Sequence, residues 1–199
     1  MLKDFEGIDI YVFDQLLRGR IHPGQVVLDA GCGNGRNINY MIQNGYHVMA
    51  FDRDERSLEQ VRSLCAAVAP SLSEGIRLAD ADHIPFSDHS ADVVMSIAVL
   101  HFAHDHGQFN AMFAELMRVL KPGGVFICRM ASIHGMEKKA QDLGDGRFHL
   151  PDGTERYLCS ENQLLDLTAK FGGTLLDPLK TTVVHGLRAM TTWVFQKGS

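Results

Sequence analysis

The residues whose types and spacing most clearly suit chemistry lie in VLDAGCGNGRN, residues 27–37, where glycines alternate behind a short apolar run. The glycines are Gly31, Gly33 and Gly35. Turns of this kind let the backbone approach a nucleotide cofactor closely. A dinucleotide turn also needs a third small residue, which lets the following helix pack against the strand. Arg36 occupies that position here. Because a long cation fits poorly there, the spacing disfavours NAD.

Three acidic residues stand where short apolar runs end. Asp29 would repel a pyrophosphate, but it can hold a ligand ammonium directly or through water. Asp52 lies 21 positions after Gly31, where nucleotide-binding α/β folds carry a carboxylate for the ribose hydroxyls. Asp80 can reach the exocyclic amine of an adenine, and the amide of Ala81 can meet a ring nitrogen. Together these residues favour a nucleoside that carries an amino acid.

A sheet must bring these residues together, and the pattern of apolar residues predicts one. Apolar runs alternate with segments of helical period, which implies right-handed βαβ units and a mostly parallel sheet. In such a sheet, ligands bind beyond the carboxyl ends of the strands. The expected strands are 25–30, 46–52, 76–79, 91–99 and 125–130, and the expected helices are 6–20, 36–44, 55–68 and 108–120.

The C-terminal part of the chain departs from this alternation. Ser160 is expected to cap a helix over 161–171, and strands are expected over 174–184 and 189–196. Only four residues separate those strands, too few for a crossover helix, so they should pair as an antiparallel hairpin. The predicted fold class is α/β, a doubly wound, mostly parallel seven-stranded sheet with an antiparallel C-terminal strand. One domain is expected over residues 1–199.

Residues 132–157 have no clear period and contain several glycines and charges. Such a composition should bury little apolar surface, so we expect this segment to be mobile until a ligand binds. It lies between the fifth strand and the closing helix, beside the expected reaction centre. We therefore predict that it forms a lid, together with residues 1–15 of an N-terminal helical segment spanning 1–21.

Composition limits the partners and the compartment. A formal net charge of −5 argues against a nucleic-acid surface. No apolar run has the length of a signal peptide or a membrane span, so no membrane partner is expected. The four cysteines are scattered without a Cys-x-x-Cys pair. These features predict a cytoplasmic protein with reduced thiols.

Over residues 22–131 the chain resembles the class I S-adenosylmethionine-dependent methyltransferases. The resemblance is carried by the glycine motif and by VMAFDRD, LADADHIPFSDHSADVVMS and LMRVLKPGGVFI. GNGRN followed by GYHVMAFD looks most like the tellurite-resistance methyltransferase group. The resemblance implies a Rossmann-like methyltransferase fold, S-adenosyl-L-methionine as cofactor and a small-molecule methyl acceptor. The Asn-Pro-Pro-Tyr loop of amino-methylating DNA enzymes is absent after Val94.

The resemblance also assigns roles to individual residues. The glycine loop and Asp29 would bind the methionine part, Asp52 the ribose, and Asp80 with Ala81 the adenine. Ser96 and Ile97 would offer backbone carbonyls to the ammonium. The cofactor-binding residues implied in this way are Asp29, Gly31, Gly33, Gly35, Asp52, Arg53, Asp80, Ala81, Ser96 and Ile97.

The acceptor side has one candidate catalytic residue, His101, as a general base or as a contact to the acceptor. Methyl transfer from a sulfonium needs a base only when the acceptor carries a proton of high pKa. His101, His104 and His106 match no standard zinc spacing, so no metal is expected. Further residues that could bind an anionic acceptor are Arg156, Tyr157 and Arg188.

Other interpretations remain open at this point. The chain could be a non-catalytic S-adenosylmethionine-binding module that regulates a partner, because displacement obliges no particular side chain. An NAD-dependent oxidoreductase is disfavoured by Arg36. A glycine-rich turn that binds no ligand is the simplest alternative.

Overall fold

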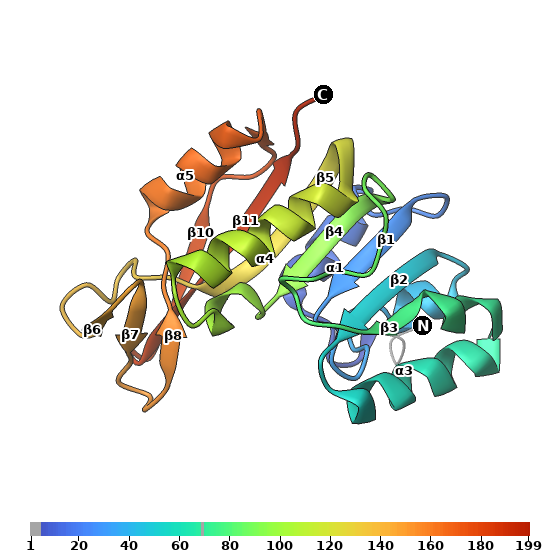
Figure 1. Ribbon diagram of the computed structural model, residues 1–199, viewed down its shortest axis with the longest axis horizontal. Coiled ribbons are helices and arrows are strands. Elements are labelled where there is room, and N and C mark those ends of the chain that lie inside the picture. The colour runs from blue at the N-terminus through green and yellow to red at the C-terminus, as the bar shows by residue number, and fades with distance from the viewer. Residues whose placement is uncertain (1–4, 69) are drawn as a thin grey trace.

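The computed structural model describes residues 5–68 and 70–199, so residues 1–4 of the predicted N-terminal segment lie outside the described residues. A central sheet runs in the order β3-β2-β1-β4-β5-β11-β10, and β9 pairs with β11 as an eighth strand (Figure 1). The strands are β1 Val26–Ala30, β2 His47–Asp52, β3 Ile76–Leu78, β4 Ala91–Ile97, β5 Leu120–Ala131, β9 Thr174–Leu175, β10 Lys180–Val184 and β11 Arg188–Gln196.

Strands β1 to β5 pair in parallel, whereas β11 is antiparallel to β5, β9 and β10. The predicted fold class, a doubly wound sheet with an antiparallel C-terminal strand, is therefore confirmed. The expected strand over 174–184 is wrong in its extent, because it divides into β9 and β10. Pro178 lies in the interval between them and cannot donate a ladder hydrogen bond.

Helices cover both faces of the sheet. The helices are α1 Ile10–Leu17, α2 Asn39–Gln43, α3 Glu55–Val68, α4 His106–Val119 and α5 Glu161–Lys170, with short 3-10 turns η2 Pro70–Gly75 and η3 Leu100–Phe102. The side chains of neighbouring strand residues point to opposite faces of the sheet. Val27 belongs to the buried cluster that includes residues of α1, α2 and α3, whereas Leu28 belongs to the cluster that includes residues of α4 and α5. No helix in the described part of the chain is long and apolar enough to cross a bilayer.

Local capping sets where several helices begin. The Asp9 side chain accepts a hydrogen bond from the Tyr11 amide, so α1 starts at Ile10 and not at residue 6 as expected. The predicted cap of α5 is confirmed, because Ser160 and Gln163 form a reciprocal capping box. The helix expected over 36–44 is confined to α2, which is five residues long.

The segment 132–157 is more regular than its composition indicated. It contains a separate antiparallel sheet of β6 Gln141–Gly144, β7 Arg147–His149 and β8 Glu155–Tyr157, which Figure 1 shows at the end of the molecule opposite α3. Met136 and Leu150 are buried in a cluster of their own with Leu158. The expectation that this segment buries little apolar surface is wrong, because strands this short leave no readable period.

Candidate active site

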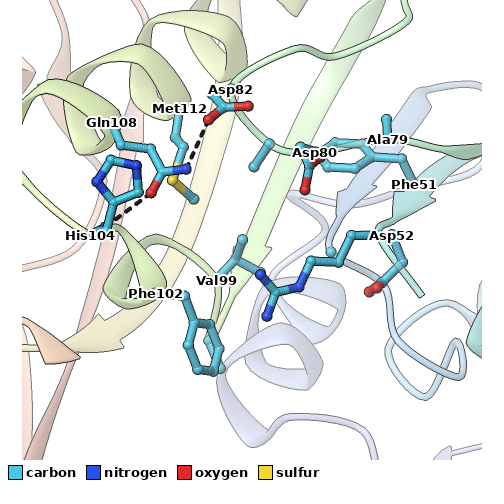
Figure 2. A pocket seen from close by; sticks show the side chains of 14 residues that line it. Phe51, Asp52, Ala79, Asp80, Asp82, Val99, Phe102, His104, Gln108 and Met112 are labelled. Atoms are coloured by element: carbon cyan, nitrogen blue, oxygen red, sulfur yellow. Dashed lines mark hydrogen bonds between the residues drawn. The ribbon is translucent and has the colours of Figure 1, made fainter. Parts of the chain in front are cut away.

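A cavity of about 430 Å³ opens where β1, β2, β3 and β4 end. Its position agrees with the rule that ligands bind beyond the carboxyl ends of parallel strands. Figure 2 shows Asp52 and Asp80 on one side of the cavity and Gln108 and Met112 on the other. Of the sequence-predicted cofactor residues, those that line it are Gly31, Asp52, Arg53, Asp80 and Ala81.

The glycine loop forms a wall that side chains would obstruct. Gly31 has a positive φ of 72°, and a Cβ there would lie 2.5 Å from a methyl group of Val99, which lines the same cavity. Only glycine fits this close approach. Gly33 also has a positive φ, of 54°, and a Cβ there would meet no atom within 4 Å, but this residue does not line the cavity.

The Asp52 carboxylate holds the glycine loop in place. One oxygen accepts a hydrogen bond from the Gly33 amide at 2.8 Å, and the other accepts from the Asp54 amide at 2.9 Å. Each carboxylate oxygen has a second acceptor position, so Asp52 can also bind the two hydroxyls of a ribose. Asp54 in turn accepts hydrogen bonds from the Arg56 amide and the Ser57 hydroxyl at the start of α3. Because Asp54 caps this helix, Asp52 remains available to bind a ligand.

Asp29 is buried beneath this loop, with 1% of its surface exposed. Within the described residues, neither of its carboxylate oxygens has a hydrogen-bond partner. Burial raises the pKa of this carboxyl to about 7, with Arg36 opposing the rise and Asp52 adding to it. A buried, unpaired carboxylate is costly, and it suits a ligand that brings a cation such as an ammonium. Asp29 does not line the cavity itself, so a water-mediated contact is the arrangement that fits.

Ser96 and Ile97 are both buried and do not line the cavity. The next two residues, Ala98 and Val99, line it instead. Ala98 adopts a positive φ of 63°, and its amide donates to the Arg129 carbonyl at 2.7 Å. A contact from the Ser96 and Ile97 carbonyls to the cofactor stays a prediction. Gly35 likewise does not line the cavity, and a Cβ there would lie 3.0 Å from the Val61 side chain.

A second cavity, of about 270 Å³, adjoins the first at Ala98, which lines both. It brings together residues from η3, β5, β8 and β11. The lining includes His101, Arg129, Leu150, Asp152, Arg156, Arg188 and Met190. Both candidate arginines of the acceptor side, Arg156 and Arg188, therefore lie at this cavity. Tyr157 is buried and bonds to His106 instead.

His101 is buried, and its Nδ1 lies 3.1 Å from the Ala131 amide, which must donate to it. In a neutral ring whose Nδ1 accepts, Nε2 carries the proton. Burial, together with the charges of Arg156, Arg129 and Arg188, lowers the pKa of His101 to about 4. At neutral pH the ring is therefore an uncharged donor through Nε2. This arrangement supports a contact to the acceptor and disfavours a general base.

The other two histidines of this segment point to separate partners. His104 pairs with Asp105 at 2.9 Å, and the His106 Nδ1 lies 2.7 Å from the Tyr157 hydroxyl. Among the residues that the structure describes, no group of three or more His, Cys, Asp or Glu side chains is arranged to hold a metal ion.

Some cavity residues were missed from sequence. Gln108 donates to Asp82 at 2.9 Å and accepts from the His104 amide at 3.0 Å, which closes one wall of the larger cavity. Asp82 follows Asp80 by two positions, so its place in the sequence could have predicted that it lies near the same cavity. Met112 is a core residue at 5% exposure, but it also lines the cavity.

The N-terminal segment is tied to both sites. Arg36, beside the glycine loop, donates to the Gly7 carbonyl at 2.8 Å. Arg129, at the second cavity, pairs with Asp9 at 2.9 Å. The predicted lid role of residues 1–15, of which 5–15 are described, stays a prediction.

Comparison with known sequences identifies the family. The profile of the methyltransferase domain family matches residues 28–128, which include the glycine loop, all three acids and His101. This chain belongs to the methyltransferase domain family. An uncharacterized methyltransferase, YodH, from Bacillus subtilis is 35% identical over 109 residues, covering 53% of this chain and 42% of that protein.

A malonyl-[acyl-carrier protein] O-methyltransferase from Serratia marcescens is 33% identical over 150 residues, covering 75% of this chain and 52% of that protein. The chain spans about half the length of the curated relatives it matches.

Solved structures share the fold. A SAM-dependent methyltransferase from Methanosarcina mazei superposes with a TM-score of 0.71 at 20% identity, covering 92% of this chain and 97% of that one. The [4+2]-cyclase SpnF superposes with a TM-score of 0.69 at 17% identity, covering 94% and 80%. The methyltransferase domain family supports S-adenosylmethionine as the cofactor, and the residues around the larger cavity suit it.

Proposed function

We propose that this chain transfers a methyl group from S-adenosylmethionine to a small-molecule acceptor held in the second cavity. The observation that carries the proposal is the junction of the two cavities at Ala98. One cavity has the features that suit an amino-acid-bearing nucleoside. The other is small, lies beside it and is lined by polar side chains that can orient an acceptor.

When bound, S-adenosylmethionine supplies an electrophilic methyl group on a sulfonium. The residues of this chain then have two tasks, which are to align the acceptor with that methyl group and to keep water away. Asp52 and Asp80 would hold the nucleoside, and Asp29 would balance its ammonium through water. His101 offers a hydrogen-bond donor to the acceptor and does not need to remove a proton.

The fold alone does not establish methyl transfer, because a fold of this kind also occurs in a protein named as a cyclase. A regulatory module that binds S-adenosylmethionine is the alternative. The test is a panel of candidate acceptors, each scored by the release of S-adenosylhomocysteine. A reaction without S-adenosylmethionine serves as the blank. Tight cofactor binding without release for any acceptor would favour the regulatory alternative. A cytoplasmic location stays a prediction from the cysteine spacing.

A further inference from the structure

Three arginines converge on the second cavity from distant parts of the chain. Arg129 lies in β5, Arg156 lies in β8, and Arg188 is the first residue of β11. One carboxylate, Asp152, lines the same cavity. This concentration of positive charge contrasts with the chain as a whole, whose formal net charge is −5.

We infer that the second cavity recognises an oxyanion on the methyl acceptor, a carboxylate or a phosphate, through Arg129, Arg156 and Arg188. The inference rests on the proposed function and adds the chemical class of the acceptor. Guanidinium groups suit this task because each presents five N–H donors in a planar fork that matches both kinds of anion.

The existing partners of the arginines leave donors for such a ligand. Arg188 lies 3.6 Å from Asp152, which is long for a charge-assisted hydrogen bond. Arg156 donates to the Glu155 carbonyl at 2.7 Å, and in the described part of the chain no carboxylate lies within 4.0 Å of it. Its charge is therefore not neutralised by a carboxylate of the described residues.

Neighbouring aromatic rings fix the orientation of two of these guanidinium groups. The Arg156 guanidinium stacks over the Phe102 ring, 4.8 Å from its centroid. Arg129 lies 5.5 Å from the Tyr11 centroid and pairs with Asp9. Its buried Nε has no hydrogen-bond partner among the described residues. An anionic ligand in the cavity would reduce the repulsion among three like charges.

His101 contributes to the same surface without adding charge. It lines the cavity, and its Nε2 proton is left available because Nδ1 accepts from Ala131. A neutral donor beside three cations can bind an anion or an adjacent acceptor oxygen. An imidazolium there would instead add to the repulsion.

The test uses the full chain saturated with S-adenosylhomocysteine and three probes, which are succinate, its neutral diamide succinamide and inorganic phosphate. Calorimetry measures the affinity of each probe for the wild type and for Arg156→Gln and Arg188→Gln. Arg62→Gln is the matched control, because Arg62 lies on α3 and pairs with Glu55 far from the cavity. Arg129 is left intact because it also anchors the segment before α1.

We expect succinate or phosphate to bind, and succinamide to bind at least about tenfold more weakly. Each cavity variant should weaken anion binding by about tenfold or more, with Arg62→Gln unchanged. The succinate and phosphate arms separate a carboxylate from a phosphate. Equal binding of succinamide, anion affinity unchanged in both variants, or no anion binding up to about 10 mM would each overturn the inference.

Two further measurements distinguish a failure of this inference from a failure of the proposed function. The affinity for S-adenosylhomocysteine should be the same in all four proteins, and thermal unfolding should show that all are folded. Failure of S-adenosylhomocysteine to bind the wild type would count against the proposed function. In that case the calorimetry of the anions would be repeated without S-adenosylhomocysteine, and its result would still decide the inference about the arginines.

Discussion

Replacing Asp29 with Asn should stabilise the empty protein and weaken its binding of S-adenosylhomocysteine. The reason is that Asp29 is buried without a hydrogen-bond partner in the described structure, and its pKa rises from 3.8 to about 7 on folding. A difference of about three pH units corresponds to about 4 kcal/mol. An unpaired amide also costs free energy on burial, so the net gain expected at pH 8 is about 2 to 4 kcal/mol.

The pH dependence follows from the direction of the pKa change. The folded state holds its proton more tightly than the unfolded state, so ionisation of Asp29 costs stability as the pH rises from about 4 to about 7. Above about 7 the full cost is present, and below about 4 it is absent. The stability advantage of Asp29→Asn should therefore be largest at pH 8 and should shrink towards zero near pH 4.

Urea unfolding of the empty wild type, Asp29→Asn and Asp166→Asn at pH 4, 6 and 8 measures this difference. Asp166 is exposed on α5, so its variant controls for the loss of one charge. Calorimetry at pH 8 then measures S-adenosylhomocysteine affinity, which should fall by about tenfold or more in Asp29→Asn alone. The reasoning is refuted if Asp29→Asn is less stable than the wild type at pH 8, or if its advantage does not depend on pH.

Three further predictions concern other parts of the site. Asp52→Ala should weaken S-adenosylhomocysteine binding by about 30- to 100-fold, or about 2–3 kcal/mol, because ribose contacts and the Gly33 anchor are lost; unchanged affinity by calorimetry would place the ribose elsewhere. His101→Gln, which keeps a donor, should retain turnover within about tenfold, whereas a loss of about 10²-fold or more in initial rate would indicate a general base. Hydrogen exchange across 132–157 should slow when S-adenosylhomocysteine and an acceptor are both bound, and exchange that ligands leave unchanged would exclude a lid.

Much of the cofactor side was predictable because it depends on local signals. Gly31, Asp52 and Asp80 each follow a short apolar run, and parallel strands bring such positions to one edge of the sheet. Ser160 is likewise a local signal, because a serine at this position predicts the start of α5. These features depend on a few consecutive residues, which a single sequence displays directly.

The acceptor side depends on contacts between distant residues. Arg129, Arg156 and Arg188 share no spacing pattern, and only the placement of β5, β8 and β11 brings them to one cavity. The small sheet was missed because its strands have three or four residues, too few to show an alternation. The tautomer of His101 depends on the Ala131 amide, thirty positions away.

The central claim is methyl transfer between the two cavities, and a labelled methyl group tests it most directly. The protein is incubated with S-adenosylmethionine carrying a deuterated methyl group and with the acceptor panel, and products are examined by mass spectrometry. The account predicts one acceptor that gains a single deuterated methyl group, with an equal amount of S-adenosylhomocysteine and with strong loss of both products in Asp52→Ala. Tight cofactor binding with no labelled product from any acceptor would contradict it.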